Sequence, residues 1–164
     1  GSEMCIRDSY PAADIAERED VRYVELDELI RSSDLITLHV PLMDATRGMI
    51  NAETIEKMRD GVVIINVSRG ELVDIEALTQ GIEAEKIGAV AMDVFPHEDG
   101  IYFEDRMNDI LANRDMAYLR QFPNVVLTQH LAYYTEEDVR YMVECGIENA
   151  IAMLGDGCDS ELWH

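Results

Sequence analysis

Short apolar runs alternate along this chain with segments of helical periodicity. The apolar runs cover residues 34–40, 61–67, 87–93 and 124–129. In the second run, Val62-Val-Ile-Ile65, apolar residues follow one another without a break, which is typical of strands buried on both faces of a parallel sheet. The alternation therefore predicts an α/β fold in which helices flank a parallel sheet.

Helix starts lie between the predicted strands. Asp27, Asn51 and Asp74 each precede a helical segment and offer a side-chain oxygen to its first N–H groups. Thr135, with Asp138 three residues later, resembles a capping box. We expect the helix that follows Thr135 to pack on another surface, because it has an apolar stripe. The stripe consists of Val139, Met142, Val143, Gly146, Ile147, Ala150 and Leu154.

Residues 96–123 form the irregular part of the chain, for which we expect one helix and a lid-like loop. The chain has 164 residues, which corresponds to about one domain. Its 13 basic and 34 acidic residues give a net charge of −21, which opposes nucleic acid and anionic membrane surfaces as partners. An anionic substrate would therefore need a few placed cations.

Cysteine use indicates a reducing compartment, and we expect a cytoplasmic location. Cys5, Cys145 and Cys158 form neither a CxxC pair nor a cluster with histidine at metal-binding spacing, so no metal site is predicted. No apolar run is long enough for a membrane span.

The residues that leave the predicted strands carry chemistry. Ligands of open parallel sheets bind at the carboxyl ends of the strands. At these ends the chain has Arg69, which suits carboxylate binding, the acids Asp93 and Glu98, and His130, which suits proton transfer. Each also has a purely structural interpretation: Arg69 paired with an acidic neighbour, His130 bonded to backbone, and both acids solvated. Spacing alone leaves these alternatives open.

The ordered motifs resemble those of the D-isomer-specific 2-hydroxyacid dehydrogenases, with most similarity to the D-lactate dehydrogenase branch. They are His39-Val-Pro41, Asn66-Val-Ser-Arg-Gly-Glu-Leu-Val-Asp74, Met92-Asp93 with Glu98, and Thr128-Gln-His130. The resemblance runs from about Tyr10 to Leu154. It implies a Rossmann-like, truncated nucleotide-binding domain, NAD as cofactor, a small 2-oxo or 2-hydroxy acid as substrate, and a homodimeric full-length parent.

The resemblance also implies roles for single residues. Arg69 would bind the substrate carboxylate, His130 would exchange a proton with the substrate oxygen, and Glu98 would hydrogen-bond His130 and favour its protonated form. The remaining predicted site residues would line the nicotinamide and ribose end of the cofactor. They are Val40, Pro41, Thr46, Val67, Ser68 and Asp93.

The sequence departs from the family pattern in its first part. It contains no GxGxxG turn for the cofactor pyrophosphate, and the resemblance places the strand, turn and helix of that motif before Gly1. We interpret residues 1–9 as a foreign leader, residues 10–154 as a partial NAD-binding domain that ends in a long helix, and residues 155–164 as a tail. Gln129 stands where most family members have proline.

Two functional hypotheses follow. The first is NAD-dependent reduction of pyruvate to D-lactate by the full-length parent, with the fragment alone inactive. The second is a non-catalytic, NAD-binding or corepressor-like module of the same fold. A phospho-receiver domain fits less well, because it would have a lysine after its last strand, where this chain has His130.

Overall fold

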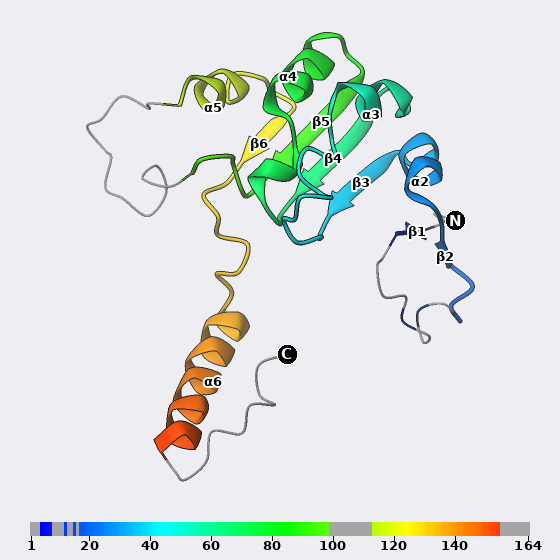
Figure 1. Cartoon of the computed structure of the whole chain (residues 1–164). Coiled ribbons are helices and arrows are strands. Elements are labelled where there is room, and N and C mark those ends of the chain that lie inside the picture. Colours follow the sequence, from blue (N-terminus) through cyan, green and yellow to red (C-terminus); the bar gives the residue numbers. More distant parts are fainter. Residues whose placement is uncertain (1–3, 8–11, 13–14, 16, 99–112, 155–164) are drawn as a thin grey trace. The chain divides into compact units, whose positions relative to one another are not determined.

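The computed structural model describes residues 4–7, 12, 15, 17–98 and 113–154. Four strands form a parallel sheet in the order β3-β4-β5-β6 (Figure 1). They are β3 (Leu35–Leu38), β4 (Val62–Asn66), β5 (Ile87–Met92) and β6 (Val125–Leu127), each inside a predicted run. The predicted α/β class, a parallel sheet flanked by helices, is confirmed.

Helices α3 (Ala52–Lys57) and α4 (Ile75–Glu83) connect the central strands, and their caps are those predicted. The Asn51 side chain accepts the Thr54 N–H, and the Asp74 carboxylate accepts the N–H groups of Glu76 and Ala77. The prediction for Asp27 was wrong. Helix α2 (Leu26–Ser32) begins after Glu25, and Asp27 lies in its first turn, where it accepts a hydrogen bond from Arg31.

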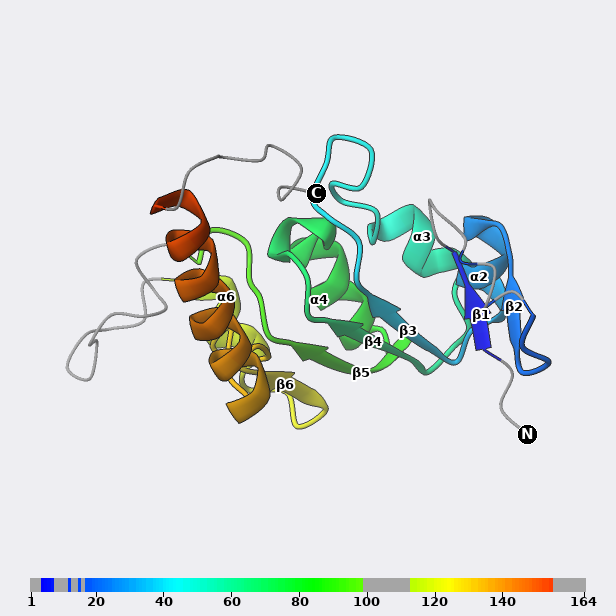
Figure 2. The same cartoon turned by 90° about the horizontal axis from the view of Figure 1, so that it is seen from below.

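The core lies between one face of the sheet and the helices, with α3 and α4 over that face in Figure 2. Inward residues of the strands, such as Ile36, Ile64 and Val90, pack there with apolar residues of α3, α4 and α5 (Arg114–Leu119). Burial on both faces was also expected, and here the structure differs. Burial alternates along β3 and β4, and among the described residues the second face leaves Leu35 53% exposed.

Two short strands form a separate parallel pair. β1 (Met4–Ile6) lies within the predicted leader, and it pairs with β2 (Val21–Tyr23) in the register Met4 to Val21. Three-residue strands are too short to show a period, so the sequence did not indicate them. Residues 4–6 therefore take part in the fold, whatever their origin.

The chain divides into two compact units, residues 1–129 and residues 130–164. The second unit contains α6 (Glu136–Leu154), which starts at the predicted capping box, because Thr135 accepts the Asp138 N–H and donates to the Asp138 carboxylate. Three residues of the apolar stripe of α6, Met142, Val143 and Ile147, are solvent-exposed in this unit, Ile147 by 56%. Within the described residues, none of the helices is both long and apolar enough for a membrane span.

The irregular segment 96–123 contains the one predicted helix, α5. The predicted lid-like loop falls on residues 99–112, which lie outside the described residues, as does the predicted tail at 155–164.

Candidate active site at the carboxyl ends of the strands

The chain turns sharply after β4, and the side chain of Asn66 stabilises the turn. Asn66 Nδ2 donates to the carbonyl oxygen of Arg69 at 2.8 Å, and Asn66 Oδ1 accepts the Ser68 N–H at 3.1 Å. The short 3-10 helix η1 (Gly70–Leu72) follows directly. The buried Asn66 amide therefore binds the backbone at both Ser68 and Arg69.

Gly70 joins this turn to the end of β5. A Cβ atom on Gly70 would lie 2.2 Å from the carbonyl carbon of Phe95 and 2.3 Å from the nitrogen of Pro96, closer than any side chain permits. The Asn66 carbonyl also accepts the Asp93 N–H at 3.0 Å. The ends of β4 and β5 are thus in direct backbone contact.

A further contact joins this turn to the end of β3. Ser68 Oγ donates to the Val40 carbonyl at 2.6 Å. Beyond Val40, the Thr46 hydroxyl donates to the Pro41 carbonyl at 2.7 Å and accepts the Met43 N–H at 2.9 Å. These two hydroxyl groups stabilise loops. Val67, at the end of β4, leaves 39% of its surface exposed at the same edge.

Arg69 is a solvent-exposed cation at this edge. Its Nη1 donates to the Ser68 carbonyl at 2.7 Å, and it forms no ion pair with an acidic side chain of the described residues. Several other basic residues do form ion pairs: Arg31 holds the pKa of Asp27 below its ordinary value, and Lys57 does the same for the pKa of Glu53. In so acidic a chain, an unpaired guanidinium is a ready partner for an external carboxylate.

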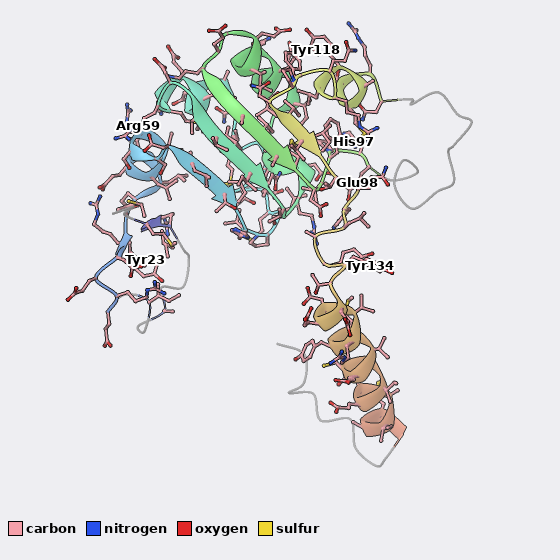
Figure 3. The ribbon with its side chains drawn as sticks, turned by 180° about the vertical axis from the view of Figure 1, so that it is seen from behind. Tyr23, Arg59, His97, Glu98, Tyr118 and Tyr134 are labelled. Carbon is pink, nitrogen blue, oxygen red and sulfur yellow. The ribbon has the colours of Figure 1, made fainter. Side chains whose placement is uncertain are left out.

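Two carboxyl groups follow β5. Asp93 is buried, with 5% of its surface exposed, and its Oδ1 accepts a hydrogen bond from the Thr128 hydroxyl at the end of β6. Glu98 Oε2 accepts the Phe95 N–H at 2.8 Å. Figure 3 shows Glu98, beside His97, on the segment that leaves β5. Asp93 and Glu98 thus lie on the segment that leaves β5, and Phe95, which contacts Gly70, lies between them.

His130 is the first residue of the second unit, two residues after Thr128. Its φ of 54° is in the left-handed region, which costs free energy for a residue with a Cβ. His97, next to Glu98, has a φ of 56°. The ring of His130 lies edge-to-face with that of Tyr133, with centroids 6.4 Å apart. Strained backbone of this kind is found disproportionately at functional sites.

In the described part of the first unit, the turn that carries Ser68 and Arg69 therefore contacts Val40 on one side and the segment with Asp93 on the other. Thr46 stabilises the loop after Val40, and Glu98 binds the N–H of Phe95, whose carbonyl carbon lies against Gly70. Asn66 is the first residue of the motif at 66–74, but it was not among the predicted site residues. The signal that could have identified it is an amide at a position where the alternation of β4 requires a buried side chain.

A sequence model of the D-isomer specific 2-hydroxyacid dehydrogenases, for their NAD binding domain, matches residues 1–132. An aromatic 2-oxoacid reductase of Clostridium sporogenes is 46% identical over 132 residues, which is 80% of this chain and 40% of that protein. D-lactate dehydrogenase of Escherichia coli is 34% identical over 163 residues, covering 99% of this chain and 49% of that protein.

Solved structures agree with this match. The crystal structure of D-lactate dehydrogenase with NAD+ from Lactobacillus jensenii superposes with a TM-score of 0.86 at 32% identity, over 92% of this chain and 45% of that one. The chain thus spans less than half the length of these relatives. NAD, the expected cofactor, is confirmed through the domain that is matched. The chain belongs to the D-isomer-specific 2-hydroxyacid dehydrogenase family, whose NAD-binding domain it matches over residues 1–132.

Proposed function

We propose that the full product of the gene encoding this chain reduces a small 2-oxo acid to the D-2-hydroxy acid with NADH. The observation that carries this proposal is Arg69, an exposed guanidinium without an acidic partner in the described residues of a chain with net charge −21. It lies where ligands of open parallel sheets bind. Membership of the family supports the reaction type.

In this proposal Arg69 binds the substrate carboxylate. A guanidinium presents two parallel N–H groups that match the two carboxylate oxygens, which fixes the orientation as well as the position of the 2-oxo acid. A fixed orientation exposes one face of the substrate carbonyl to the cofactor, and this accounts for a single D product. The charge of Arg69 also polarises the carbonyl.

His130 is proposed as the proton donor to the substrate oxygen during reduction and as the acceptor in the reverse direction. Imidazole exchanges a proton near neutral pH, which suits a reversible reaction. Glu98 is proposed to hydrogen-bond His130 and favour its protonated form. The left-handed backbone of His130 supports a functional role, because strain of this kind persists where a side chain must point in a set direction.

The residues at the strand ends fit the nicotinamide end of NAD. The half-exposed Val67 and the exposed Pro41 offer apolar surface at the ligand-binding edge, beside the polar groups of Thr46 and Ser68 and the backbone of Val40. Asp93 completes this set. When bound, NADH supplies the hydride. The sequence has no GxGxxG turn, and we assign none of its residues to the pyrophosphate.

Pyruvate is the substrate that we propose first, because D-lactate dehydrogenases recur among the relatives and solved structures. An aromatic 2-oxo acid is the second candidate. It is favoured by the 46% identity with the aromatic 2-oxoacid reductase of Clostridium sporogenes. The expected homodimer and cytoplasmic location stay predictions.

The test is oxidation of NADH by the purified full gene product, with pyruvate and phenylpyruvate compared by kcat/KM. We expect turnover with at least one of them, and a loss of about 10²–10⁴-fold in Arg69→Gln and His130→Asn. Arg120→Gln is the control, because Arg120 is exposed and lies outside the site. Wild-type rates in both site variants would overturn the site. NADH binding without turnover of any 2-oxo acid would favour the non-catalytic module.

A further inference from the structure

Asn66 is a buried amide at the end of β4. Within the part of the chain that the structure describes, Asn66 and Asp93 are the two buried polar or charged residues, and Asn66 has 0% of its surface exposed. Burying an amide is unfavourable unless its groups find partners. Both polar atoms of Asn66 are satisfied by the turn that carries Arg69, through the Ser68 N–H and the Arg69 carbonyl.

The backbone is fixed on both sides of Arg69. Before it, Ser68 is bound through its N–H to Asn66 and through its hydroxyl to the Val40 carbonyl. After it, Gly70 lies against the backbone of Phe95, and the Arg69 carbonyl also accepts the Leu72 N–H at 3.3 Å. The guanidinium itself is exposed, so its direction depends on this backbone rather than on packing around the side chain.

We propose that Asn66 is a positioning residue for the reaction: its amide fixes the turn so that Arg69 points to the carboxylate of the 2-oxo acid. This inference rests on the proposed function of Arg69. Asn66 acts through Arg69, because it is buried beneath the turn and its two side-chain hydrogen bonds end on backbone atoms. An apolar residue at this position would fill the core but leave the Ser68 N–H without its partner.

The experiment compares Asn66→Ala and Asn66→Asp with wild type in the full gene product. Asp has nearly the same shape as Asn and keeps an acceptor for the Ser68 N–H, but it cannot donate to the Arg69 carbonyl when ionised, so it tests that second hydrogen bond by itself. Asn124→Ala is the matched control, because the Asn124 amide donates to the Gly88 carbonyl at 2.9 Å, outside the site.

We expect the KM for the 2-oxo acid to rise about 10- to 100-fold in the Asn66 variants, more than the KM for NADH. Because Asn66 acts through Arg69, adding Asn66→Ala to Arg69→Gln should cost no further activity. In the purified chain, amide hydrogen exchange of Ser68 should accelerate in Asn66→Ala. Asn124→Ala should change none of these quantities.

The outcomes separate this inference from the proposed function. If Arg69→Gln impairs turnover but the folded Asn66 variants keep the wild-type KM, or the Ser68 amide keeps its exchange rate, the positioning role is wrong and the proposed function stands. If Arg69→Gln keeps the wild-type kcat/KM for the 2-oxo acid, both fail together. A rise confined to the KM for NADH would also contradict the positioning role.

Discussion

Gly70 lies directly against Phe95, so that a Cβ atom on Gly70 would stand 2.2 Å from the Phe95 carbonyl carbon. This contact joins the turn after β4 to the segment that leaves β5. The atoms that Gly70 meets there are backbone atoms of Phe95 and Pro96, so no side chain can rotate away to make room. The position of Arg69, one residue earlier, therefore depends on the absence of a side chain at position 70.

Gly70→Ala should destabilise the chain by about 1–3 kcal/mol, the usual cost of inserting a methyl group into a close-packed contact. The measurement is the free energy of unfolding from urea denaturation of the purified chain. In the full gene product the same substitution should raise the KM for the 2-oxo acid, because separating the two strand exits displaces Arg69.

Gly146→Ala is the control for Gly70→Ala. Gly146 lies in α6, with no atom within 4 Å of the place where its Cβ would be. Alanine stabilises an exposed helical position by roughly 0.5–1 kcal/mol relative to glycine. The same change should therefore have opposite signs at the two positions, and destabilisation of equal size at both would contradict the packing argument.

Thr128→Val should destabilise the first unit by about 1–2 kcal/mol. The substitution keeps the shape of the side chain but deletes the hydroxyl that donates to the buried Asp93 carboxylate. Thr128→Ser should retain most of the stability. Thr37→Val is the control, because the Thr37 hydroxyl contacts His39 on an exposed surface. If Thr37→Val lost as much stability as Thr128→Val, the loss would come from replacing a threonine by valine and not from the hydrogen bond to Asp93.

Asp74→Ala should cost about 1 kcal/mol of unfolding free energy, because the Asp74 carboxylate caps α4 through two backbone N–H groups. Glu25 occupies the same position at the start of α2 but makes no side-chain cap. Glu25→Ala should therefore leave stability within about 0.5 kcal/mol of wild type. The pair is compared by thermal unfolding at neutral pH, and equal effects would argue against the cap.

Strong local patterns made the sheet and three helix starts predictable, those at Asn51, Asp74 and Thr135. The runs at 61–67 and 87–93 contain β4 and β5 because consecutive apolar residues leave few alternatives, and Asn51 and Asp74 cap as their side chains allow. Burial on both faces was overestimated. A run of apolar residues is compatible with one or two covered faces, and the sequence does not say which residues cover them.

The site was predictable at the level of which residues leave the strands, but not how they are held. Ser68 and Thr46 have hydroxyl groups that bind loop carbonyls, and Gly70 meets Phe95, 25 positions away in sequence. The contacts of Ser68 and Gly70 are long-range, and the contact of Thr46 is a loop contact within five residues, so local periodicity encodes none of them. The contacts of Asn66 are local, with Ser68 and Arg69, but they belong to a turn that has no periodic pattern in the sequence.

Tyr118 provides a test by pH. Its hydroxyl, on α5, donates to the Glu83 carboxylate of α4 at 2.6 Å, and this hydrogen bond raises the pKa of Tyr118 above its ordinary value of 10.0. Figure 3 shows Tyr118 beside helices α4 and α5. Its ring also lies edge-to-face with that of Phe122, at 5.2 Å.

Above pH 10, the folded chain retains the Tyr118 proton that the unfolded chain has lost, so unfolding releases a proton and stability falls as pH rises. The contribution is fully present below pH 10 and is lost as pH passes through the raised value. Tyr118→Phe keeps the ring contact but deletes the hydroxyl, so it should be slightly less stable at pH 8 and should lose less stability between pH 9 and 11. Urea unfolding of both chains across this range measures the difference, and parallel pH profiles would show that the hydrogen bond to Glu83 contributes nothing.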